Sequence, residues 1–95
     1  MNVYWTDTAQ DHLAAIHAYI AKDSPEYAMR MVDRLTRRSQ QIADFPFSGR
    51  VVPEFTVSQI REVLEGPYRV LYHVKTGQID VLAVIHAARD VLRNA

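Results

Sequence analysis

The stretch YRVLYHVKTGQIDVLAVIH, residues 68–86, decides the fold, because it predicts two β-strands joined by a tight turn. Apolar or aromatic residues recur at every second position, which is the period of a strand. Thr76-Gly77 separates the two runs and is typical of a two-residue hairpin turn. Such a turn places Lys75 opposite Gln78 and thereby fixes every other facing pair in the hairpin.

This register sorts the side chains into two faces. The first is apolar or aromatic and should pack on helices. It comprises Tyr68, Val70, Tyr72, Val74, Ile79, Val81, Ala83 and Ile85. The second face mixes charge with apolar residues and carries Arg69, Leu71, His73, Asp80, Leu82, Val84 and His86. It places His73 opposite Asp80 and Arg69 near His86. A half-apolar face rimmed by charge is typical of an interaction surface, unless the C-terminal tail folds over it.

Two helices are predicted upstream of the hairpin. After a short strand at Asn2–Trp5, an apolar stripe indicates a helix from Ala9 to about Lys22, with cap candidates just before it. Ser24-Pro25 starts a second helix that runs to about Ala43. Because about three residues join the two helices, they should form an antiparallel hairpin.

The rest of the chain completes the sheet. Residues 45–50, FPFSGR, break the second helix, and residues 51–58 read as a loop with a short extended piece. Ile60–Leu64 should be a fourth strand, although its pattern leaves the direction of Arg61 open. The order β-α-α-β-β-β predicts one α+β domain over residues 1–95, an antiparallel sheet with a helical hairpin on one face. Residues 87–95 are expected to form a short helical tail.

Composition excludes several classes of protein. The chain has no cysteine and a formal net charge of zero, which argues against a disulfide framework and against broad binding to nucleic acid. The N-terminus does not resemble a signal peptide, and no apolar run is long enough to span a membrane. We therefore expect a cytoplasmic protein. His12 and His17 lack metal-ligand spacing, and the three glycines form no phosphate loop, so neither a metal nor a cofactor is expected.

Several segments, in this order, resemble toxins of the ParE/RelE superfamily from type II toxin–antitoxin systems. They are Trp5 with the helix ending Tyr19-Ile20-Ala21, then Ser24–Ala28, Pro46–Arg50, Ile60–Val63, Tyr68–Tyr72 and Val84–Asp90. No single motif is specific, but the ordered combination covers nearly the whole chain. The resemblance implies a toxin neutralised by a small antitoxin whose C-terminal segment wraps it. It also implies one of two targets: ParE-type members poison DNA gyrase, and RelE- or YoeB-type members cut mRNA on the ribosome.

The residues favour the ParE branch. RNA cleavage needs a cation and an acid or base, which Arg69 and His86 could supply, with Arg61 as a second cation. However, Ala87 follows His86 where the family's nucleases usually carry a tyrosine or a histidine–tyrosine pair, and no tyrosine occurs after Tyr72. A ribosome-bound nuclease should also be strongly positive. The H-x-x-R-D ending, residues 86–90, looks more like ParE.

We therefore expect a toxin that inhibits DNA gyrase by binding and is neutralised by a ParD-type antitoxin. Two alternatives are a ribosome-dependent endoribonuclease and a target-inactive homologue that acts only in an autoregulatory antitoxin complex. The expected target- or antitoxin-binding residues are Arg61, Arg69, Leu71, Leu82, Val84, His86, Arg89 and Asp90. The competing structural roles are an ion pair of Arg69 with Glu62 or Asp90, a local hydrogen bond of His86, and capping of the tail by Arg89 and Asp90.

Overall fold

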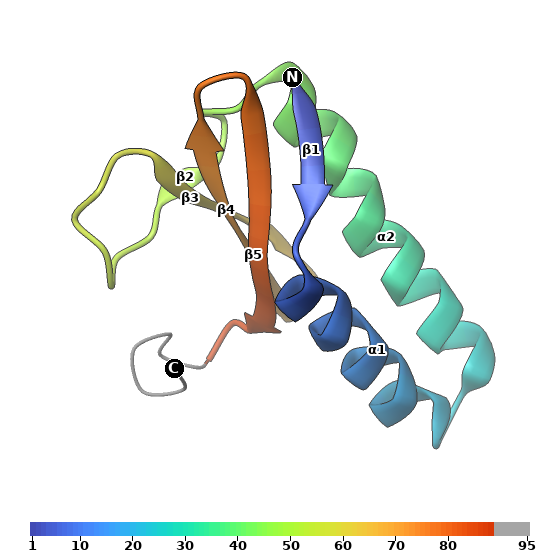
Figure 1. Cartoon of the computed structure of the whole chain (residues 1–95). Coiled ribbons are helices and arrows are strands. Elements are labelled where there is room, and N and C mark those ends of the chain that lie inside the picture. Colours follow the sequence, from blue (N-terminus) through green and yellow to red (C-terminus); the bar gives the residue numbers. More distant parts are fainter. Residues whose placement is uncertain (89–95) are drawn as a thin grey trace.

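The structure, a computed structural model, describes residues 1–88 and confirms the predicted α+β class (Figure 1). Its elements are β1 (Asn2–Trp5), α1 (Asp7–Ala21), α2 (Pro25–Asp44), β2 (Arg50–Val51), β3 (Ile60–Glu65), β4 (Tyr68–Lys75) and β5 (Gln78–His86). The strands form one sheet in the order β1-β5-β4-β3-β2. All neighbours are antiparallel except β1, which pairs with β5 in parallel. The two-residue strand β2 was expected only as part of a loop.

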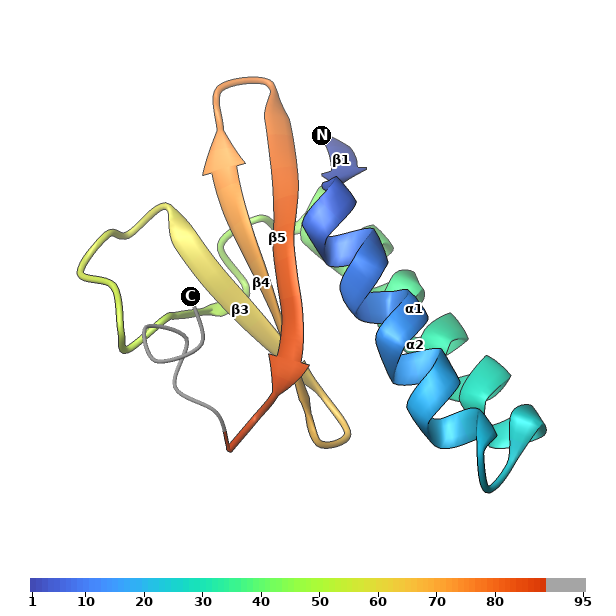
Figure 2. The same cartoon turned by 60° about the horizontal axis from the view of Figure 1, so that its bottom comes forward.

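Both helices begin at the capping residues that the sequence supplies. The Thr6 hydroxyl accepts a hydrogen bond from the backbone N–H of Ala9 at 3.2 Å, so α1 starts two residues earlier than expected. The Ser24 hydroxyl accepts one from Tyr27 at 3.1 Å, with Pro25 at the first turn of α2. Figure 2 shows the two helices side by side on one face of the sheet. None of the helices in residues 1–88 is long and apolar enough to cross a membrane.

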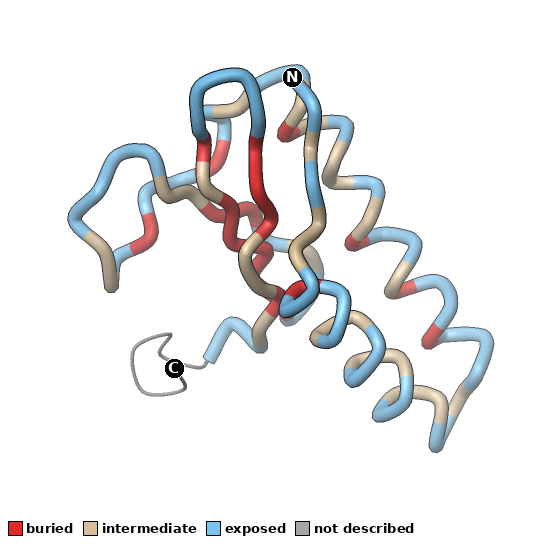
Figure 3. Tube along the Cα trace, viewed as in Figure 1, coloured by how far each residue is buried: buried red, intermediate tan, exposed pale blue. Residues whose placement is uncertain are grey.

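The core lies between this helical layer and the sheet, and Figure 3 shows its buried stretches in red. One side of each helix contributes, with Leu35 and Ile42 of α2 fully buried. The sheet side is formed by Val63, Tyr68, Val70, Tyr72, Val74, Ile79, Val81 and Val84. Within residues 68–86, every member of this set except Val84 lies on the face that the alternation assigned to the helices. The exception comes from one irregularity in β5.

That irregularity is a β-bulge at Leu82. The Thr76-Gly77 turn forms as predicted, with Lys75 opposite Gln78 and His73 opposite Asp80. The register then shifts between Leu71 and Tyr72: Tyr72 faces Val81, but Leu71 faces Ala83. Leu82 is therefore an extra residue in β5, and an extra residue exchanges the two faces for the rest of the strand.

The bulge corrects the predicted positions of four residues. Val84 faces Val70 and is buried in the helix-side core, and His86 faces Tyr68. Ala83 and Ile85 take their places on the other side of the sheet, so Arg69 faces Ile85 and does not lie opposite His86. Residues 81–85 are apolar throughout, so alternation of polar and apolar residues could not reveal the shift.

Helix α1 bonds to the bulged part of β5. The backbone N–H of Val84 donates to Nδ1 of His12 at 3.0 Å, and the Thr6 hydroxyl donates to the carbonyl of Val81 at 2.7 Å. Strand β1 pairs with β5 only as far as Val81, so these side chains satisfy edge groups that no strand covers. The bulged part of β5 thus bonds to residues that lie more than 70 positions earlier in the sequence.

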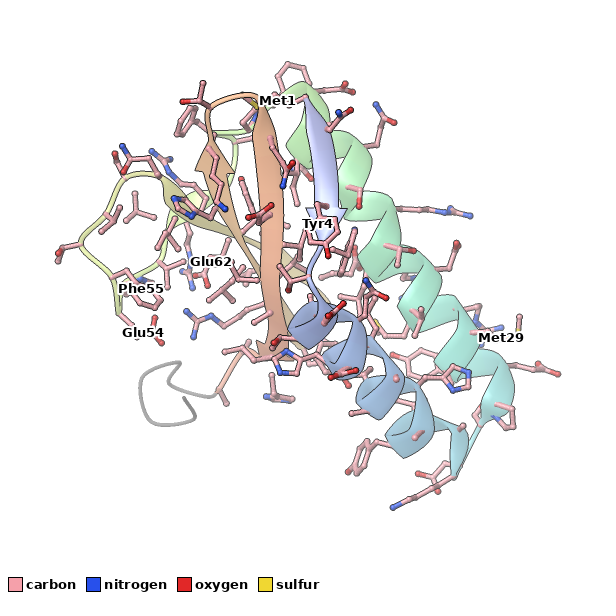
Figure 4. The ribbon with its side chains drawn as sticks, in the orientation of Figure 1. Met1, Tyr4, Met29, Glu54, Phe55 and Glu62 are labelled. Atoms are coloured by element: carbon pink, nitrogen blue, oxygen red, sulfur yellow. The ribbon has the colours of Figure 1, made fainter. Side chains whose placement is uncertain are left out.

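The reverse face of the sheet, which is the face away from the helices, was expected to be open, and this is wrong for its centre. Glu62 and Leu71 are 1% exposed and Arg69 is 4% exposed. Val52 of the long loop between β2 and β3 is also fully buried. Figure 2 shows this loop on the side opposite the helices, and Figure 4 shows Glu54 and Phe55 on it. The chain's own loop therefore seals part of the surface that was predicted to bind a partner.

Gly49 should be the position where adding a single methyl group costs the most. A Cβ there would lie 2.5 Å from both the carbonyl oxygen of Glu62 and the hydroxyl of Tyr72. We expect Gly49→Ala to lower the free energy of unfolding by about 1–3 kcal/mol, measured in urea. The matched control is Gly77→Asn in the exposed turn, where nothing lies within 4 Å and asparagine tolerates the left-handed backbone. Equal losses at the two glycines would contradict the close approach.

Candidate functional site

Four charged side chains form a network on the reverse face, which we call the arginine–glutamate clasp: Arg50, Glu54, Glu62 and Arg69. Nε of Arg69 donates to Oε1 of Glu62 at 2.6 Å, and its Nη1 and Nη2 donate to the two oxygens of Glu54 at 2.9 and 2.7 Å. Nε of Arg50 donates to the other oxygen of Glu62. The clasp therefore joins β2, β3, β4 and the loop after β2.

Burial makes the clasp a structural element. The side chain of Glu62 is fully buried and that of Arg69 is 5% exposed. Hydrogen bonds to Glu54 and then Glu62 raise the pKa of Arg69 above its ordinary value, although burial opposes them. The charge of Arg69 is thus matched by two carboxylates of the same chain. Of the roles considered for Arg69, the ion pair with Glu62 is the one observed.

Arg61 points to the helix side of the sheet, which settles the direction that the sequence left open. It faces Tyr72 across β3 and β4. Its guanidinium lies 5.0 Å from the ring centre of Phe47. It donates to the carbonyl oxygens of Ser58 at 2.7 Å, Gly49 at 3.1 Å and Phe47 at 3.4 Å. Arg61 therefore holds the chain on both sides of β2 in place.

His86 lies at the far end of the sheet, in the wall of a groove. Its ring meets Tyr68 edge to face at 6.0 Å, and its Nδ1 accepts a local hydrogen bond from the N–H of Ala88 at 3.3 Å. The groove runs between α1 and the ends of β4 and β5 and has a volume of about 580 Å³. It is lined by Ala15, Ile16, Tyr19, Tyr68, His86 and Ala88. Tyr19 is 71% exposed at its rim, so the groove is mostly apolar and open to solvent.

The three candidates for nuclease chemistry do not converge. Arg69 lies on the reverse face, whereas Arg61 and His86 lie on the helix side. Arg61 is level with Tyr72, and His86 is level with Tyr68, which lies four residues earlier in β4. At strand spacings this separates their backbones by roughly 13 Å along the strands and about 10 Å across them. One phosphate could not contact all three side chains in this arrangement.

The other predicted binding residues are also dispersed. Leu71 and Val84 are buried on opposite faces of the sheet, and Leu82 is half-buried at the bulge. Arg89 and Asp90, like most of the predicted helical tail, lie outside the described residues. Within residues 1–88, no group of three His, Asp or Glu side chains is placed to hold a metal ion.

Sequence reasoning missed Glu54, the groove residues Ala15, Ile16 and Tyr19, and two exposed phenylalanines, Phe45 and Phe47. Glu54 carried a weak signal, since it is the one charge in the otherwise apolar run from Val51 to Phe55. A loop has no periodicity, however, so its partner could not be identified. The phenylalanines carried a clearer signal, because two of them flank a proline in a predicted loop, where large apolar residues have no core to enter.

Comparisons with known proteins agree on the kind of protein. Residues 3–91 match the family described as "ParE toxin of type II toxin-antitoxin system, parDE". The chain is 36% identical to "Toxin RelE2" of Caulobacter vibrioides over 92% of this chain and 96% of that one. Its fold is similar to a structure titled "Chromosomal ParDE TA system from P. aeruginosa", with a TM-score of 0.73, 24% identity, and coverage of 90% of this chain and 95% of that one. It is also similar to the toxin–antitoxin complex RelBE2 of Mycobacterium tuberculosis, with a TM-score of 0.64, 20% identity, and coverage of 90% and 95%.

Replacing Arg69 should destabilise the fold strongly. Arg69→Met keeps much of the side-chain volume but leaves the buried carboxylate of Glu62 without one of its two arginines. We expect a loss of about 3–5 kcal/mol in the free energy of unfolding, measured in urea. The control is Arg37→Met, which removes an exposed pair with Asp33 on α2 and should cost less than about 0.5 kcal/mol. Similar small losses in both variants would show that the clasp contributes little.

Proposed function

Because the chain belongs to the ParE toxin family of type II toxin–antitoxin systems, we propose that it inhibits DNA gyrase by binding and cuts no RNA. We further propose that a ParD-type antitoxin neutralises it in the cytoplasm. The observation that carries the binding mechanism is the state of Arg69. Its guanidinium is buried and held by two carboxylates of the chain, so its charge is already compensated before any substrate arrives.

The placement of the other two candidates supports the same proposal. Arg61 already donates to three backbone carbonyls. His86 lies on the same face of the sheet but two strands away, beside Tyr68. General acid–base cleavage requires its groups within hydrogen-bond reach of one phosphodiester. A toxin that acts by gripping a protein has no such requirement, and a net charge of zero suits it equally well.

The groove beside α1 is the surface that best fits the antitoxin. Two solved structures with the same fold are the ParDE toxin–antitoxin system of P. aeruginosa and the toxin–antitoxin complex RelBE2 of Mycobacterium tuberculosis. An antitoxin segment that orders on binding needs a concave apolar surface for its side chains. The groove provides about 580 Å³, aromatic walls at Tyr19 and Tyr68, and a polar group at His86. We therefore assign His86 to antitoxin binding.

Purified gyrase provides the direct test of the target. We expect the chain to inhibit DNA supercoiling at micromolar concentration, and His86→Ala to inhibit equally, because His86 performs no chemistry in this proposal. Relaxation by topoisomerase I is the control and should be unaffected. The proposal fails if gyrase is untouched and toeprinting shows mRNA cut at fixed codon positions by the wild-type chain but no longer by Arg61→Ala or His86→Ala.

The antitoxin site is tested by filling the groove. Ala15→Arg introduces a long cation into the lining while its exposed helical position should leave folding intact. We expect this variant to stop growth even when a ParD-type antitoxin is co-expressed, and to lose co-purification with it. The matched control is Ala18→Arg, which is also exposed on α1 but does not line the groove. Full neutralisation of Ala15→Arg would place the antitoxin elsewhere.

A further inference from the structure

The segment between α2 and β2 displays two large apolar side chains to solvent. We call residues 45–49 the aromatic loop. Phe45 is 66% exposed and Phe47 is 55% exposed. Val51, two residues after the loop, is 41% exposed. Aromatic side chains gain most when a partner buries them, and residues of this kind dominate binding energy at protein interfaces. The loop is therefore the place to look for binding energy that the fold itself does not use.

The loop is held rigidly, which is unusual for so exposed a segment. The Tyr72 hydroxyl donates to the carbonyl of Pro46 at 2.7 Å and accepts from the N–H of Gly49 at 3.1 Å. The N–H of Ser48 donates to the carbonyl of Phe45 at 2.9 Å. Because the backbone is already fixed, little conformational entropy remains to be lost on binding. The backbone that carries the two rings is thus preorganised for contact.

Positive charge borders the rings. The guanidinium of Arg61 lies 5.0 Å from the ring centre of Phe47, and the side chain of Arg50 is 59% exposed. The N-terminal ammonium of Met1 donates to the carbonyl of Ala43 at 3.3 Å, just before the loop. The neighbouring carboxylate of Asp44 accepts a hydrogen bond from the Gln40 side chain at 2.9 Å. The complementary surface is an apolar pocket with carboxylates at its rim.

We propose that Phe45 and Phe47 anchor the toxin to its folded target protein by inserting into such a pocket. The proposal rests on the binding function proposed above and names the part of the toxin that performs it. An exposed pair of rings on an ordered backbone is suited to a pocket that a large folded protein can supply. An antitoxin segment that orders on binding instead needs a groove in the toxin, and that groove lies at the other end of the sheet. Single-stranded RNA could also stack on the rings, but such binding uses an extended cationic surface, whereas these rings adjoin the carboxylate of Asp44 as well as Arg61, and the formal net charge of the chain is zero.

The aromatic loop and the groove are far apart in the fold. The loop begins at the end of α2, and Met1 bonds to Ala43 there. The next residue, Asn2, pairs with Gln78 at the start of β5, so the loop lies near that end of the strand. The groove includes His86 at the opposite end of β5. Figure 4 shows Met1 at one end of α2 and Met29 at the other. One toxin could therefore hold target and antitoxin at separate surfaces.

The test compares Phe45→Ser/Phe47→Ser with Met29→Ser. Met29 is 68% exposed and lies near the start of α2, so the control removes a similar apolar side chain far from the loop. Each variant is first checked by circular dichroism and thermal unfolding. Binding of purified gyrase and growth arrest on induction are then measured. We expect the double variant to lose about tenfold or more in gyrase affinity and to allow growth, while Met29→Ser behaves as wild type.

A labelling measurement keeps the proposal testable even if the double variant unfolds. Since the chain has no cysteine, Ser48→Cys introduces a unique thiol at an exposed position of the loop and keeps both rings. We expect gyrase to protect this thiol from maleimide and to leave a thiol at Met29→Cys reactive. Full reactivity of the Ser48→Cys thiol in the gyrase complex would overturn the proposal. So would wild-type affinity of the double variant for gyrase, or a double variant that loses the wild-type chain's binding to a single-stranded oligonucleotide and keeps its binding to gyrase.

Failure of the target and failure of the loop can be told apart. If the wild-type chain inhibits gyrase and the double variant does so equally, the loop proposal falls and the gyrase proposal stands. If the wild-type chain arrests growth without touching gyrase and the double variant does not arrest growth, gyrase is the wrong target and the loop proposal stands. A wild-type chain that neither arrests growth nor binds gyrase would overturn both.

Discussion

The buried carboxylate of Glu62 constrains the half of the molecule that faces away from the helices. A fully buried carboxylate must be paired, since an isolated charge in the interior costs several kcal/mol or more. Arg50 and Arg69 pair with its two oxygens from the neighbouring strands, and Glu54 then balances Arg69. This sequence of pairings draws the loop after β2 against the sheet. These pairings explain why the reverse face, which was expected to be open, is partly covered by the loop after β2.

Tyr72 performs a similar task on the helix side. It is fully buried, and its hydroxyl reaches the loop after α2, bonding to Pro46 and Gly49. Burial raises the pKa of Tyr72, so the hydroxyl stays protonated and can donate and accept at once. Gly49 is needed because any larger residue would collide with that hydroxyl. The rigidity of an exposed loop thus originates in the core.

These two constraints divide the surface into parts with different uses. Arg69 and Leu71 are buried on the face where the clasp lies. The aromatic loop, which Tyr72 holds, exposes Phe45 and Phe47 to solvent. The groove at the far end of β5 remains concave and apolar. A toxin must meet two unlike partners, one that it acts on and one that silences it. An exposed aromatic loop and an apolar groove beside α1 are two different surfaces suited to two such partners.

The sequence by itself determined the element order, both helix caps, the Thr76-Gly77 turn and most of the helix-facing core. These features are local, because capping, turn chemistry and periodicity are set by residues a few positions apart. Only the tertiary structure decided the bulge at Leu82, the direction of Arg61 and the pairing of Arg69. In each case a deciding partner lies in another element of the chain: His12 for the bulge, the backbone of Phe47 and Gly49 for Arg61, and Glu54 and Glu62 for Arg69. The spatial arrangement of the candidate residues could not be predicted for the same reason, since an apolar run such as residues 81–85 carries no alternation, and loops carry no periodicity from which a charge partner could be inferred.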